Sequence, residues 1–294
     1  MGRAARAALL AMLAGACTQG PGAAIPSPAA IAGAIASRIA PLPLAGPSSA
    51  PARPDVVVIA MENTAPQVAL AQPYLASLAD RALVFSSFRA VAHPSLPNYL
   101  AFTSGQTWSI RDDGYYVLPV GRDLGAQLTA AQIPWRAYME GMERGCLDSP
   151  APYAVKHNPF AYYGGACPAN VVSFGRFAGD LAAGLPAFTW ITPDLCHDGH
   201  DCGPATADRW LATIVPQVIA SPGWARDGVL ILVWDEGAGG QDEAPLVVLS
   251  SRGKAATIDT PSDAYTVLAT IEELFGLPRL GAASQATPFT ALLH

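Results

Sequence analysis

Two adjacent carboxylates close an apolar run near the carboxyl end of the sequence. In "VLILVWDEG", residues 229–237, six apolar residues precede Asp235 and Glu236. A short apolar run rich in β-branched residues is typical of a strand that is buried on both faces. "DVVVIAMEN" repeats the arrangement and ends at Glu62 and Asn63, and "FTWITPD" is a weaker third case. Because open α/β sheets bind ligands at the carboxyl ends of their strands, these acid-tipped segments predict a cation site.

A serine in "HPSLPNYLAFTSG" is the second candidate for chemistry. Pro97 and Asn98 are predicted to open a helix that Gly105 closes, which places Ser95 just before the amino end. The free N–H groups and the helix dipole at that end favour an anion, either an alkoxide or a phosphate. The alternative is an ordinary N-cap serine. The acid-tipped strands favour the nucleophile, because a bound metal ion could activate the hydroxyl group.

Histidines gather in three short polar stretches, "HPSLPN", "KHNP" and "CHDGHDC". These stretches contain His93, His157, His197 and His200. For each of them an ordinary structural role remains the alternative. Two cysteines and two histidines within seven residues could bind zinc, but zinc motifs usually spread their ligands over two separated pairs. The segment therefore favours a disulfide that pins a tight loop and presents Asp198, His200 and Asp201 for metal ligation, phosphate contact or proton transfer.

The cysteine count indicates two disulfides. Besides Cys17 there are four cysteines, and an even number in an exported chain is typical of a disulfide framework. Three connectivities are possible. The pairing that crosses the fewest elements joins Cys196 to Cys202 and Cys146 to Cys167.

The amino terminus has the pattern of an export signal. "MGRAARAALLAMLAGAC" places Arg3 and Arg6 before an apolar stretch that ends in small residues. The start resembles bacterial lipoproteins, which are lipidated on a cysteine, here Cys17, although Ala14 stands where a leucine is usual. We therefore expect a signal peptide of lipoprotein type at residues 1–17. An Ala/Pro-rich tether follows at 18–53, and a single domain at 54–294, in a periplasmic, cell-surface or otherwise secreted protein.

Composition excludes several classes of function. Apolar residues make up 51% of the chain and charged residues 14%, and 17 basic against 23 acidic residues give a net charge of −6. No basic stripe is present, so nucleic acid is not an expected partner. The nucleophile elbow of acyl hydrolases, the zincin helix, the P-loop and the dinucleotide fingerprint are all missing from the sequence.

The elements that must position these residues alternate along the chain. Apolar runs with strand character alternate with helical patterns, which predicts an α/β fold with a mostly parallel sheet covered by helices on both faces. An irregular insertion is expected between 111 and 184. The predicted strands are 56–60, 83–88, 134–139, 229–234 and 244–250, and the predicted helices are 73–82, 98–105, 123–132, 205–220 and 262–276.

Six segments of the sequence, taken in chain order, resemble motifs of the bacterial secreted phosphoesterase family of acid phosphatases and phospholipases C. That family is part of the alkaline phosphatase superfamily. The matching segments are "MENTA", "HPSLPNYLAFTSG", "KHNPF", "TPDLCHDGHDC", "VWDEG" and "YTVLATIEELFGLP". The overall length and the closing helix are most similar to the small secreted acid phosphatases that act on phosphatidylinositol 3-phosphate. The resemblance implies an alkaline-phosphatase-like three-layer sandwich and a phosphomonoester phosphatase.

The resemblance also implies roles for individual residues. Ser95 would be the nucleophile and form a phosphoseryl intermediate, and His200 would protonate the leaving oxygen. A divalent cation, Mg²⁺, Ca²⁺ or Mn²⁺ rather than Zn²⁺, would suit the hard oxygen ligands. The implied metal ligands are Glu62, Asn63, Asp235 and Glu236, and the implied substrate contacts are Asn98 and His157. Asp198 and Asp201 are added as substrate contacts because the disulfide loop presents them. The substrate would be a small phosphorylated molecule, including a phospholipid headgroup, and contact with a membrane is expected only through a lipid on Cys17.

Two positions depart from the family pattern. Ala65 replaces a serine in the first motif, and Ala264 replaces a histidine at the start of the closing helix. The missing histidine puts a second metal ion in doubt. Two other functions therefore stay open: a phospholipase C-type phosphodiesterase, and a catalytically impaired lipoprotein that binds phosphate or phospholipid.

Overall fold

The computed structural model describes residues 54–294. The predicted signal peptide, the lipidation of Cys17 and the tether lie outside the described residues. Within residues 54–294 no helix is both long and apolar enough to cross a bilayer.

A sheet of eight strands forms the middle layer, in the order β5-β4-β6-β1-β7-β8-β2-β9. Adjacent strands are parallel except that β8 runs antiparallel to both β7 and β2. β3 and β10 form a small separate parallel pair. The strands are β1 (Asp55–Met61), β2 (Leu83–Phe85), β3 (Phe88–Arg89), β4 (Trp135–Met139), β5 (Val171–Ser173), β6 (Phe188–Thr192), β7 (Gly228–Trp234), β8 (Leu246–Ser250), β9 (Ala256–Ile258) and β10 (Ser262–Asp263).

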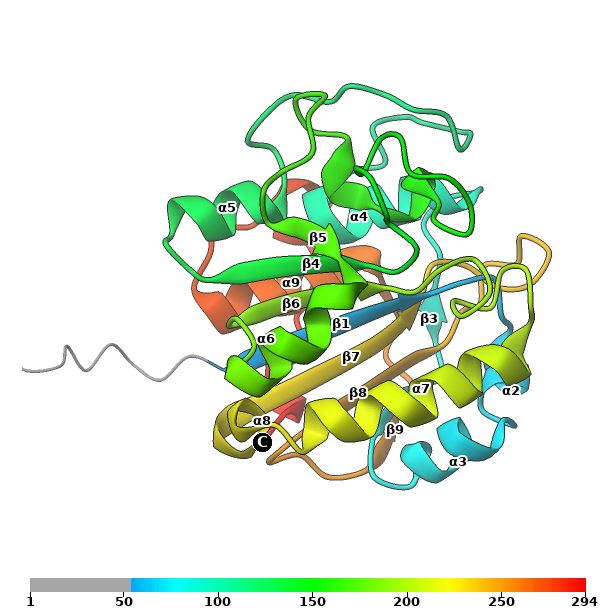
Figure 1. Ribbon diagram of the computed structural model, residues 1–294. Helices are drawn as coiled ribbons and strands as arrows, with labels where there is room; N and C mark the ends of the chain where they lie inside the picture. The colour runs from blue at the N-terminus through cyan, green and yellow to red at the C-terminus, as the bar shows by residue number, and fades with distance from the viewer. Residues whose placement is uncertain (1–53) are drawn as a thin grey trace, which may run out of the picture. The chain divides into compact units, whose positions relative to one another are not determined.

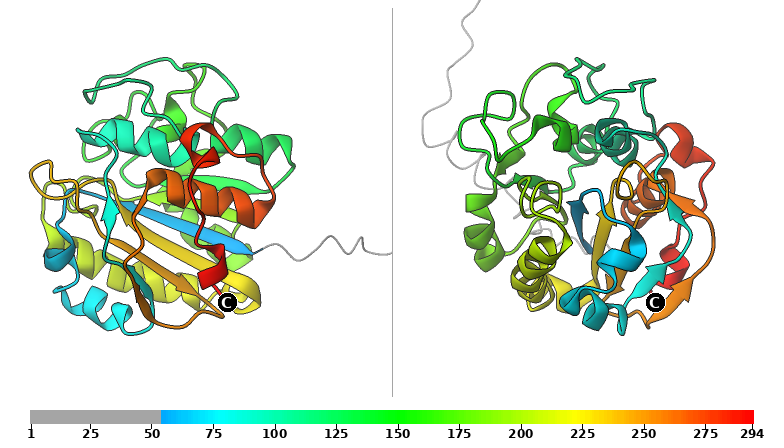
Figure 2. Two further views of the ribbon diagram at one scale, coloured as in Figure 1. Left: turned by 180° about the vertical axis from the view of Figure 1, so that it is seen from behind. Right: turned by 90° about the vertical axis from the view of Figure 1, so that its right-hand side faces the viewer.

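Helices cover both faces of the sheet, as predicted. In Figure 1 α6, α7 and α8 lie in front of the strands, and in the reverse view of Figure 2 α4 and α9 lie on the opposite face. The α-helices are α2 (Pro66–Ala69), α3 (Pro73–Ala79), α4 (Ser95–Ser104), α5 (Leu124–Ala130), α6 (Phe177–Ala183), α7 (Pro204–Ile219), α8 (Pro222–Asp227) and α9 (Ala264–Phe275). The three-layer α/β sandwich is therefore confirmed.

The central strands are the most deeply buried part of the core. Every residue of β7 is buried, and so is every residue of β1 after Asp55. β1 pairs with β6 on one side and with β7 on the other, with Met61 opposite Trp234. Runs of valine, isoleucine and leucine suit this position, because both faces of each strand pack against helices. The register brings the residues that follow β1 and β7 to the same edge.

The helix that begins at Ser95 starts earlier than the sequence predicted. α4 covers Ser95–Ser104, with Pro94 as its N-cap and Gly105 as its left-handed C-cap at φ 67°. Pro97 is tolerated because a first-turn residue has no intrahelical partner for its N–H. All ten residues of α4 are buried. The helix therefore fixes Ser95 firmly at the edge of the sheet.

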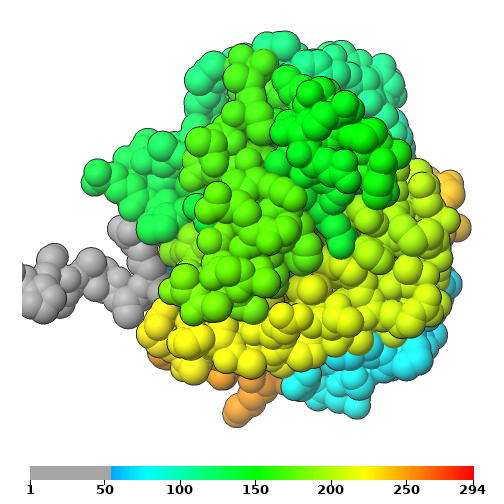
Figure 3. Space-filling model, viewed as in Figure 1, coloured from blue at the N-terminus to red at the C-terminus, as the bar shows by residue number. Residues whose placement is uncertain are grey.

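Other boundaries differ from the prediction for local reasons. The predicted strand 83–88 is two strands, β2 and β3, which belong to different sheets. The predicted helix 262–276 begins at Ala264, because Asp263 forms a capping box with Thr266. The expected insertion contains β5 and α6 besides the predicted helix and strand. In Figure 3 the green segments after β4 gather on the upper front of the molecule.

Candidate active site

The site begins where β1 and β7 end. Glu62 follows β1 directly, and Asp235 follows β7 directly. The backbone N–H of Asn63 donates to Asp235 Oδ1 at 3.3 Å, which ties the two strand ends together. Glu62 and Asp235 have exposed fractions of 0% and 1%. Two carboxylates are therefore held side by side at the sheet edge and away from water.

Ser95 faces these carboxylates from the start of α4. Its Oγ donates a hydrogen bond to Glu62 Oε2 at 3.0 Å, and the hydroxyl also lies beside Asp235. The serine is 1% exposed. Because Pro94 is the N-cap of α4, Ser95 is the first residue of the helix and does not serve as its cap. The N-cap alternative is therefore wrong.

A buried histidine extends the network from Glu62. His157 Nε2 lies 3.1 Å from Glu62 Oε1, and its Nδ1 lies 3.0 Å from Asp198 Oδ2. The ring stacks on Tyr99 with centroids 5.2 Å apart. Burial, followed by the charges of Lys156 and His200, holds the pKa of His157 well below its usual value. His157 is therefore a neutral imidazole that hydrogen-bonds to Asp198 and lies against Glu62.

Several oxygens in this network have no hydrogen-bond partner. Glu62 Oε1, Asn63 Oδ1 and Asp235 Oδ2 are buried and accept no hydrogen bond. The 3.1 Å approach of His157 Nε2 to Glu62 Oε1 is a close contact without hydrogen-bond geometry, and that nitrogen is unpaired as well. Such orphaned acceptors are costly, and they are the hard ligands that a divalent cation prefers. Glu62, His157 and His200 also bring ligand atoms within 4.8 Å of one another. The residues therefore fit a metal ion, whose identity the donor set leaves open.

The raised pKa values of the acidic side chains in the site also favour a bound cation. Burial, with the Glu236 charge second, raises the pKa of Asp235 to about 7. Burial also raises the pKa of Asp198 to about 7, and the pKa of Glu62 lies well above its usual value, for burial first and the charge of Asp235 second. A bound cation would hold these groups in their ionised form at neutral pH. We call Glu62, Asp235, His157 and Asp198 the Glu62 cluster.

Glu236 is engaged differently from Asp235. Its carboxylate contacts His93 Nδ1, and the other ring nitrogen of His93 lies 2.9 Å from Asp242 Oδ1. His93 therefore holds Glu236 at the rim of the site, and metal ligation by Glu236 stays a prediction.

Asn98 supports the loop in front of Ser95. Its Oδ1 accepts hydrogen bonds from the N–H groups of Val91 and Ala92, and its Nδ2 donates to Ala92 O at 2.7 Å. Substrate binding by Asn98 stays a prediction. In the structure its amide fixes the turn that leads into α4.

The two predicted disulfides are present. Cys196 bonds to Cys202 with a Cα–Cα distance of 4.7 Å, and Cys146 bonds to Cys167. The thiols that a zinc site would need are therefore engaged. The Cys196–Cys202 bond closes a loop in which the backbone O of Asp198 accepts from the N–H of Glu62 at 2.9 Å. This hydrogen bond attaches the loop to the end of β1.

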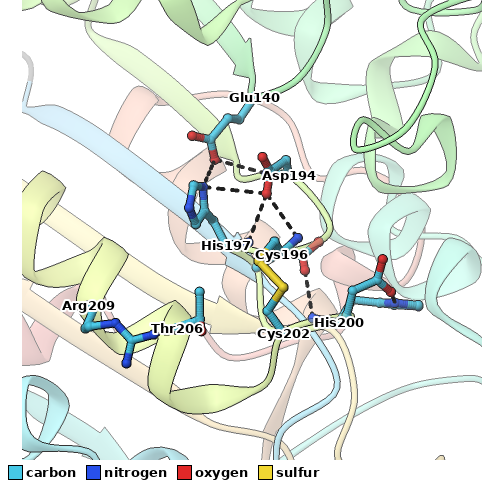
Figure 4. The surroundings of a disulfide bond; sticks show 10 residues. Glu140, Asp194, Cys196, His197, His200, Cys202, Thr206 and Arg209 are labelled. Carbon is cyan, nitrogen blue, oxygen red and sulfur yellow. Dashed lines mark hydrogen bonds and ion pairs between the residues drawn. A yellow bond between two sulfur atoms is a disulfide. The ribbon is translucent and has the colours of Figure 1, made fainter.

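A second group of acids and a histidine lies on the other side of the same loop (Figure 4). His197 Nδ1 is 3.0 Å from Glu140 Oε2 and 3.5 Å from Asp194 Oδ1. Glu140 also accepts from the backbone N–H of Asp194 and from Trp210 Nε1. We call Glu140, Asp194 and His197 the Glu140 cluster. Their ligand atoms lie within 4.8 Å of one another, as those of Glu62, His157 and His200 do, but all three side chains already have hydrogen-bond partners.

The remaining predicted residues lie at the mouth of the site. His200 donates its backbone N–H to Asp198 Oδ1 at 2.8 Å, and its Nδ1 lies 2.7 Å from Asp201 Oδ1. Asp201 is exposed and contacts His200 alone among the predicted site residues. Ala264 is 1% exposed at the first position of α9, where it packs in the core.

Sequence reasoning missed Lys156 and Asp113. Lys156 Nζ lies 3.0 Å from Asp113 Oδ2 and 3.3 Å from His200 Nε2. Lys156 had a local signal, since it precedes His157 and is one of two lysines in the chain. Asp113 had none, because it lies in an exposed loop 43 positions earlier.

Comparison with known proteins gives a consistent result. A family model described as the Phosphoesterase family matches residues 60–278. A Mycobacterium tuberculosis protein named phosphatidylinositol-3-phosphatase is 28% identical over 271 residues, which cover 87% of this chain and 89% of that protein. A phosphate-repressible acid phosphatase of Penicillium chrysogenum is 28% identical over 76% of this chain, and the chain spans 60% of that longer relative.

Solved structures support the fold alone. A Vibrio parahaemolyticus protein of the alkaline phosphatase superfamily superposes with a TM-score of 0.56 at 13% sequence identity. The match covers 80% of this chain and 71% of that one. The shared architecture agrees with the three-layer sandwich described above.

Proposed function

The chain belongs to the Phosphoesterase family, and from this membership and the geometry of the site we propose that it is a metal-dependent phosphatase that hydrolyses phosphomonoesters through Ser95. The observation that carries the proposal is the hydrogen bond from Ser95 Oγ to Glu62 Oε2, among buried carboxyl oxygens without partners. A hydroxyl group held in this way is oriented for attack and lies beside the ligands that a cation needs.

Glu62, Asn63 and Asp235 would hold the cation through their unpaired oxygens, and Glu236 would join them if it releases His93. When bound, a divalent ion stabilises an ionised serine and offsets the charge of the phosphoryl group. The protein itself supplies orientation. α4 fixes the position of Ser95, and His157 is hydrogen-bonded to Asp198 and packs its other ring nitrogen against Glu62.

Catalysis would then proceed in two steps. Ser95 Oγ attacks phosphorus in line with the leaving oxygen, which forms a phosphoseryl intermediate, and water then releases inorganic phosphate. His200 would protonate the leaving oxygen through Nε2, which contacts Lys156 at 3.3 Å in the free protein and would be released when the substrate phosphate binds Lys156, while Asp201 holds Nδ1. Asp198 accepts the backbone N–H of His200 and so fixes its position.

The substrate class follows from the relatives. One relative is named for phosphatidylinositol 3-phosphate and another for acid phosphatase activity, so a small phosphomonoester, including a lipid headgroup, is the expected substrate. Two disulfides support an oxidising compartment and hence an exported protein. A lipid anchor at Cys17 is part of this proposal.

The test is Ser95→Ala, with Ser77→Ala as its matched control. Ser77 Oγ bonds only to Tyr74 O on the exposed side of α3, so its loss should not affect turnover. Phosphate release from p-nitrophenyl phosphate should fall at least about a thousandfold in Ser95→Ala, because a covalent nucleophile is lost. The melting temperature and the metal content should stay close to wild type.

A Ser95→Ala variant that retains near wild-type turnover would refute the mechanism. The diester bis(p-nitrophenyl) phosphate separates the other functions. Faster release from the diester would indicate a phosphodiesterase, and phosphate binding without turnover in the wild type would indicate a binding lipoprotein.

A further inference from the structure

An aspartate carboxylate occupies the amino end of the helix that carries Ser95. The backbone N–H of Leu96 donates to Asp113 Oδ1 at 3.1 Å. Pro94, the N-cap of α4, offers no side-chain acceptor, and Pro97 has no N–H. The amide that directly follows Ser95 is therefore among the few donors available at this end of the helix, and it is already in use.

The same carboxylate also binds a cationic side chain of the site. Asp113 Oδ2 lies 3.0 Å from Lys156 Nζ, and that ammonium group is 3.3 Å from His200 Nε2. The side chains of Asp113 and Lys156 are 30% and 20% exposed, so the pair lies at the mouth of the site rather than in its floor. Asp113 thus bridges a helix-end amide and an ammonium group beside Ser95 and His200.

These two donors are the ones that a phosphoryl group needs. When Ser95 Oγ attacks phosphorus, the non-bridging oxygens must lie close to the N–H of the next residue, where the helix dipole stabilises negative charge. Lys156 is the nearby cation that could bind a further oxygen. A carboxylate and a phosphoryl group cannot share these donors, because both are anions and need the same positions.

We propose that Asp113 is an internal stand-in for the phosphoryl group, which the substrate displaces when its phosphate takes over Lys156 and the Leu96 amide. This inference rests on the proposed phosphatase function. No covalent bond changes in the exchange: one anion leaves two donors and another anion takes them.

The loop that carries Asp113 suits such an exchange. Asp113 lies between two buried anchors, Ile110 and Leu118. Its neighbour Asp112 folds the tip of the loop by accepting from Gly114 N and from Tyr116 Oη. The carboxylate of Asp113 can therefore rotate away from α4 while the anchors of the loop stay in place.

The exchange would weaken the binding of phosphate as a product. Because the subsite is occupied by Asp113 in the free protein, the apparent dissociation constant for phosphate rises in inverse proportion to the fraction of molecules in which the subsite is open. A product that binds weakly leaves quickly. The carboxylate would therefore favour turnover over product inhibition.

The experiment compares Asp113→Asn with Asp112→Asn in the full-length, metal-loaded protein. Both changes remove one negative charge from the same loop, but only Asp113 touches Leu96 and Lys156. Inorganic phosphate is titrated calorimetrically, and kcat and KM are measured with p-nitrophenyl phosphate. Asp113→Ala and the melting temperature of each variant show that any effect follows the carboxylate rather than misfolding.

We expect Asp113→Asn and Asp113→Ala to lower the dissociation constant for phosphate and the KM about three- to tenfold, since the internal competitor is gone. Lys156→Gln should raise both constants, and Asp112→Asn should match the wild type. A higher dissociation constant in Asp113→Asn would overturn the proposal and make Asp113 a positioning residue for Lys156. An unchanged constant would also overturn it. A wild type without turnover would refute the phosphatase function, whereas the phosphate titration needs no turnover and still decides the role of Asp113.

Discussion

The Glu62 cluster and the Glu140 cluster both contain carboxylates and a histidine. The Cys196–Cys202 loop contributes Asp198 to the first cluster and His197 to the second. They differ in how their polar atoms are satisfied. In the Glu140 cluster the side chains of Glu140 and His197 are 19% and 38% exposed, and each has hydrogen-bond partners. In the Glu62 cluster Glu62 is 0% exposed, and one of its oxygens has no hydrogen-bond partner.

We propose that this difference separates a structural group from a metal site. A His–carboxylate pair with satisfied atoms near water stabilises a loop and requires no ligand. Buried carboxylates that repel each other destabilise the fold unless a cation binds between them. Their presence in the folded protein therefore indicates a binding site. Residue type alone does not distinguish the two clusters. The following substitutions test whether burial and the lack of hydrogen-bond partners identify the cluster that binds metal.

The largest effect is expected from Asp235→Asn in the Glu62 cluster. The change removes a carboxylate that would hold the metal ion, so turnover should fall at least about a hundredfold and the bound metal should be lost. The metal-free variant should nevertheless be more stable than the metal-free wild type at pH 8, because a buried charge has been removed. Metal analysis, p-nitrophenyl phosphate assays and urea unfolding measure the three quantities.

The matched change in the other cluster is Glu140→Gln. The amide keeps an acceptor for Trp210 Nε1 or the N–H of Asp194, but loses the charge that faces His197. Metal content and turnover should stay near wild type. If Glu140→Gln removes the metal ion and Asp235→Asn does not, the assignment of the two clusters is reversed.

The next effect is a pH dependence of the metal-free protein. The pKa of Asp235 is raised to about 7 in the folded state, against an ordinary value of 3.8. Between these values the folded state binds more protons than the unfolded state, so stability is highest at low pH and falls as pH rises toward 7. The loss for Asp235 is on the order of 3 kcal/mol. Urea unfolding with a chelator at pH 5 and pH 8 measures it.

Added divalent metal should restore stability at pH 8, since it binds the deprotonated ligands. Glu272 and Asp198, whose pKa values burial also raises to about 7, contribute to the same slope, whereas His157, whose pKa burial holds well below its usual value, opposes it. Asp235→Asn therefore serves as the control, and the part of the slope that it removes belongs to the site. A difference in stability between pH 5 and pH 8 that is the same in Asp235→Asn as in the wild type would contradict the raised pKa assigned to Asp235.

The smallest effect on stability is expected from the shorter of the two disulfide loops. Replacing Cys196 and Cys202 by serine opens a loop with a sequence separation of 6, which should cost about 2 kcal/mol in the chain-entropy account. Turnover should also decrease, because Asp198 and His200 lie in that loop. Replacing Cys146 and Cys167 opens a longer loop, with a separation of 21, and should cost more stability but less activity. Thermal unfolding measures the stability of each double variant, and kcat measures its activity. Equal losses of activity in the two variants would show that the shorter loop has no special role in catalysis.

Much of the fold could be predicted from local patterns. The apolar run before Asp235 became β7 at nearly its predicted bounds, because a strand buried on both faces has an unmistakable composition. The start of α4 was predicted three residues late, since Pro97 was read as the helix opening and Pro94 as part of the preceding loop. β2 and β3 were joined in the prediction, because no local pattern shows that a strand changes sheets between Phe85 and Phe88.

The candidate site could be predicted only where its residues lie in recognisable motifs. Glu62, Ser95 and Asp235 stand at ends of elements, which the sequence marks. His93 was noticed, but its contact with Glu236 depends on two loops 143 positions apart. Asp113 lies in a loop without any motif, so its place on the Leu96 amide follows from tertiary packing alone.

The position of β1 between β6 and β7 has a consequence for how the protein becomes active. Asn63 meets Asp235 across 172 positions of sequence, and β1 finds both its neighbours only after most of the chain has been made. Contacts of such long range form late, because the entropy of closing large loops must be overcome first. An amino-terminal fragment that ends before β7 lacks Asp235 and Glu236, two of the four proposed metal ligands. We therefore expect phosphate release to appear only when the central sheet is complete, so that enzymatic activity would report a late stage of folding.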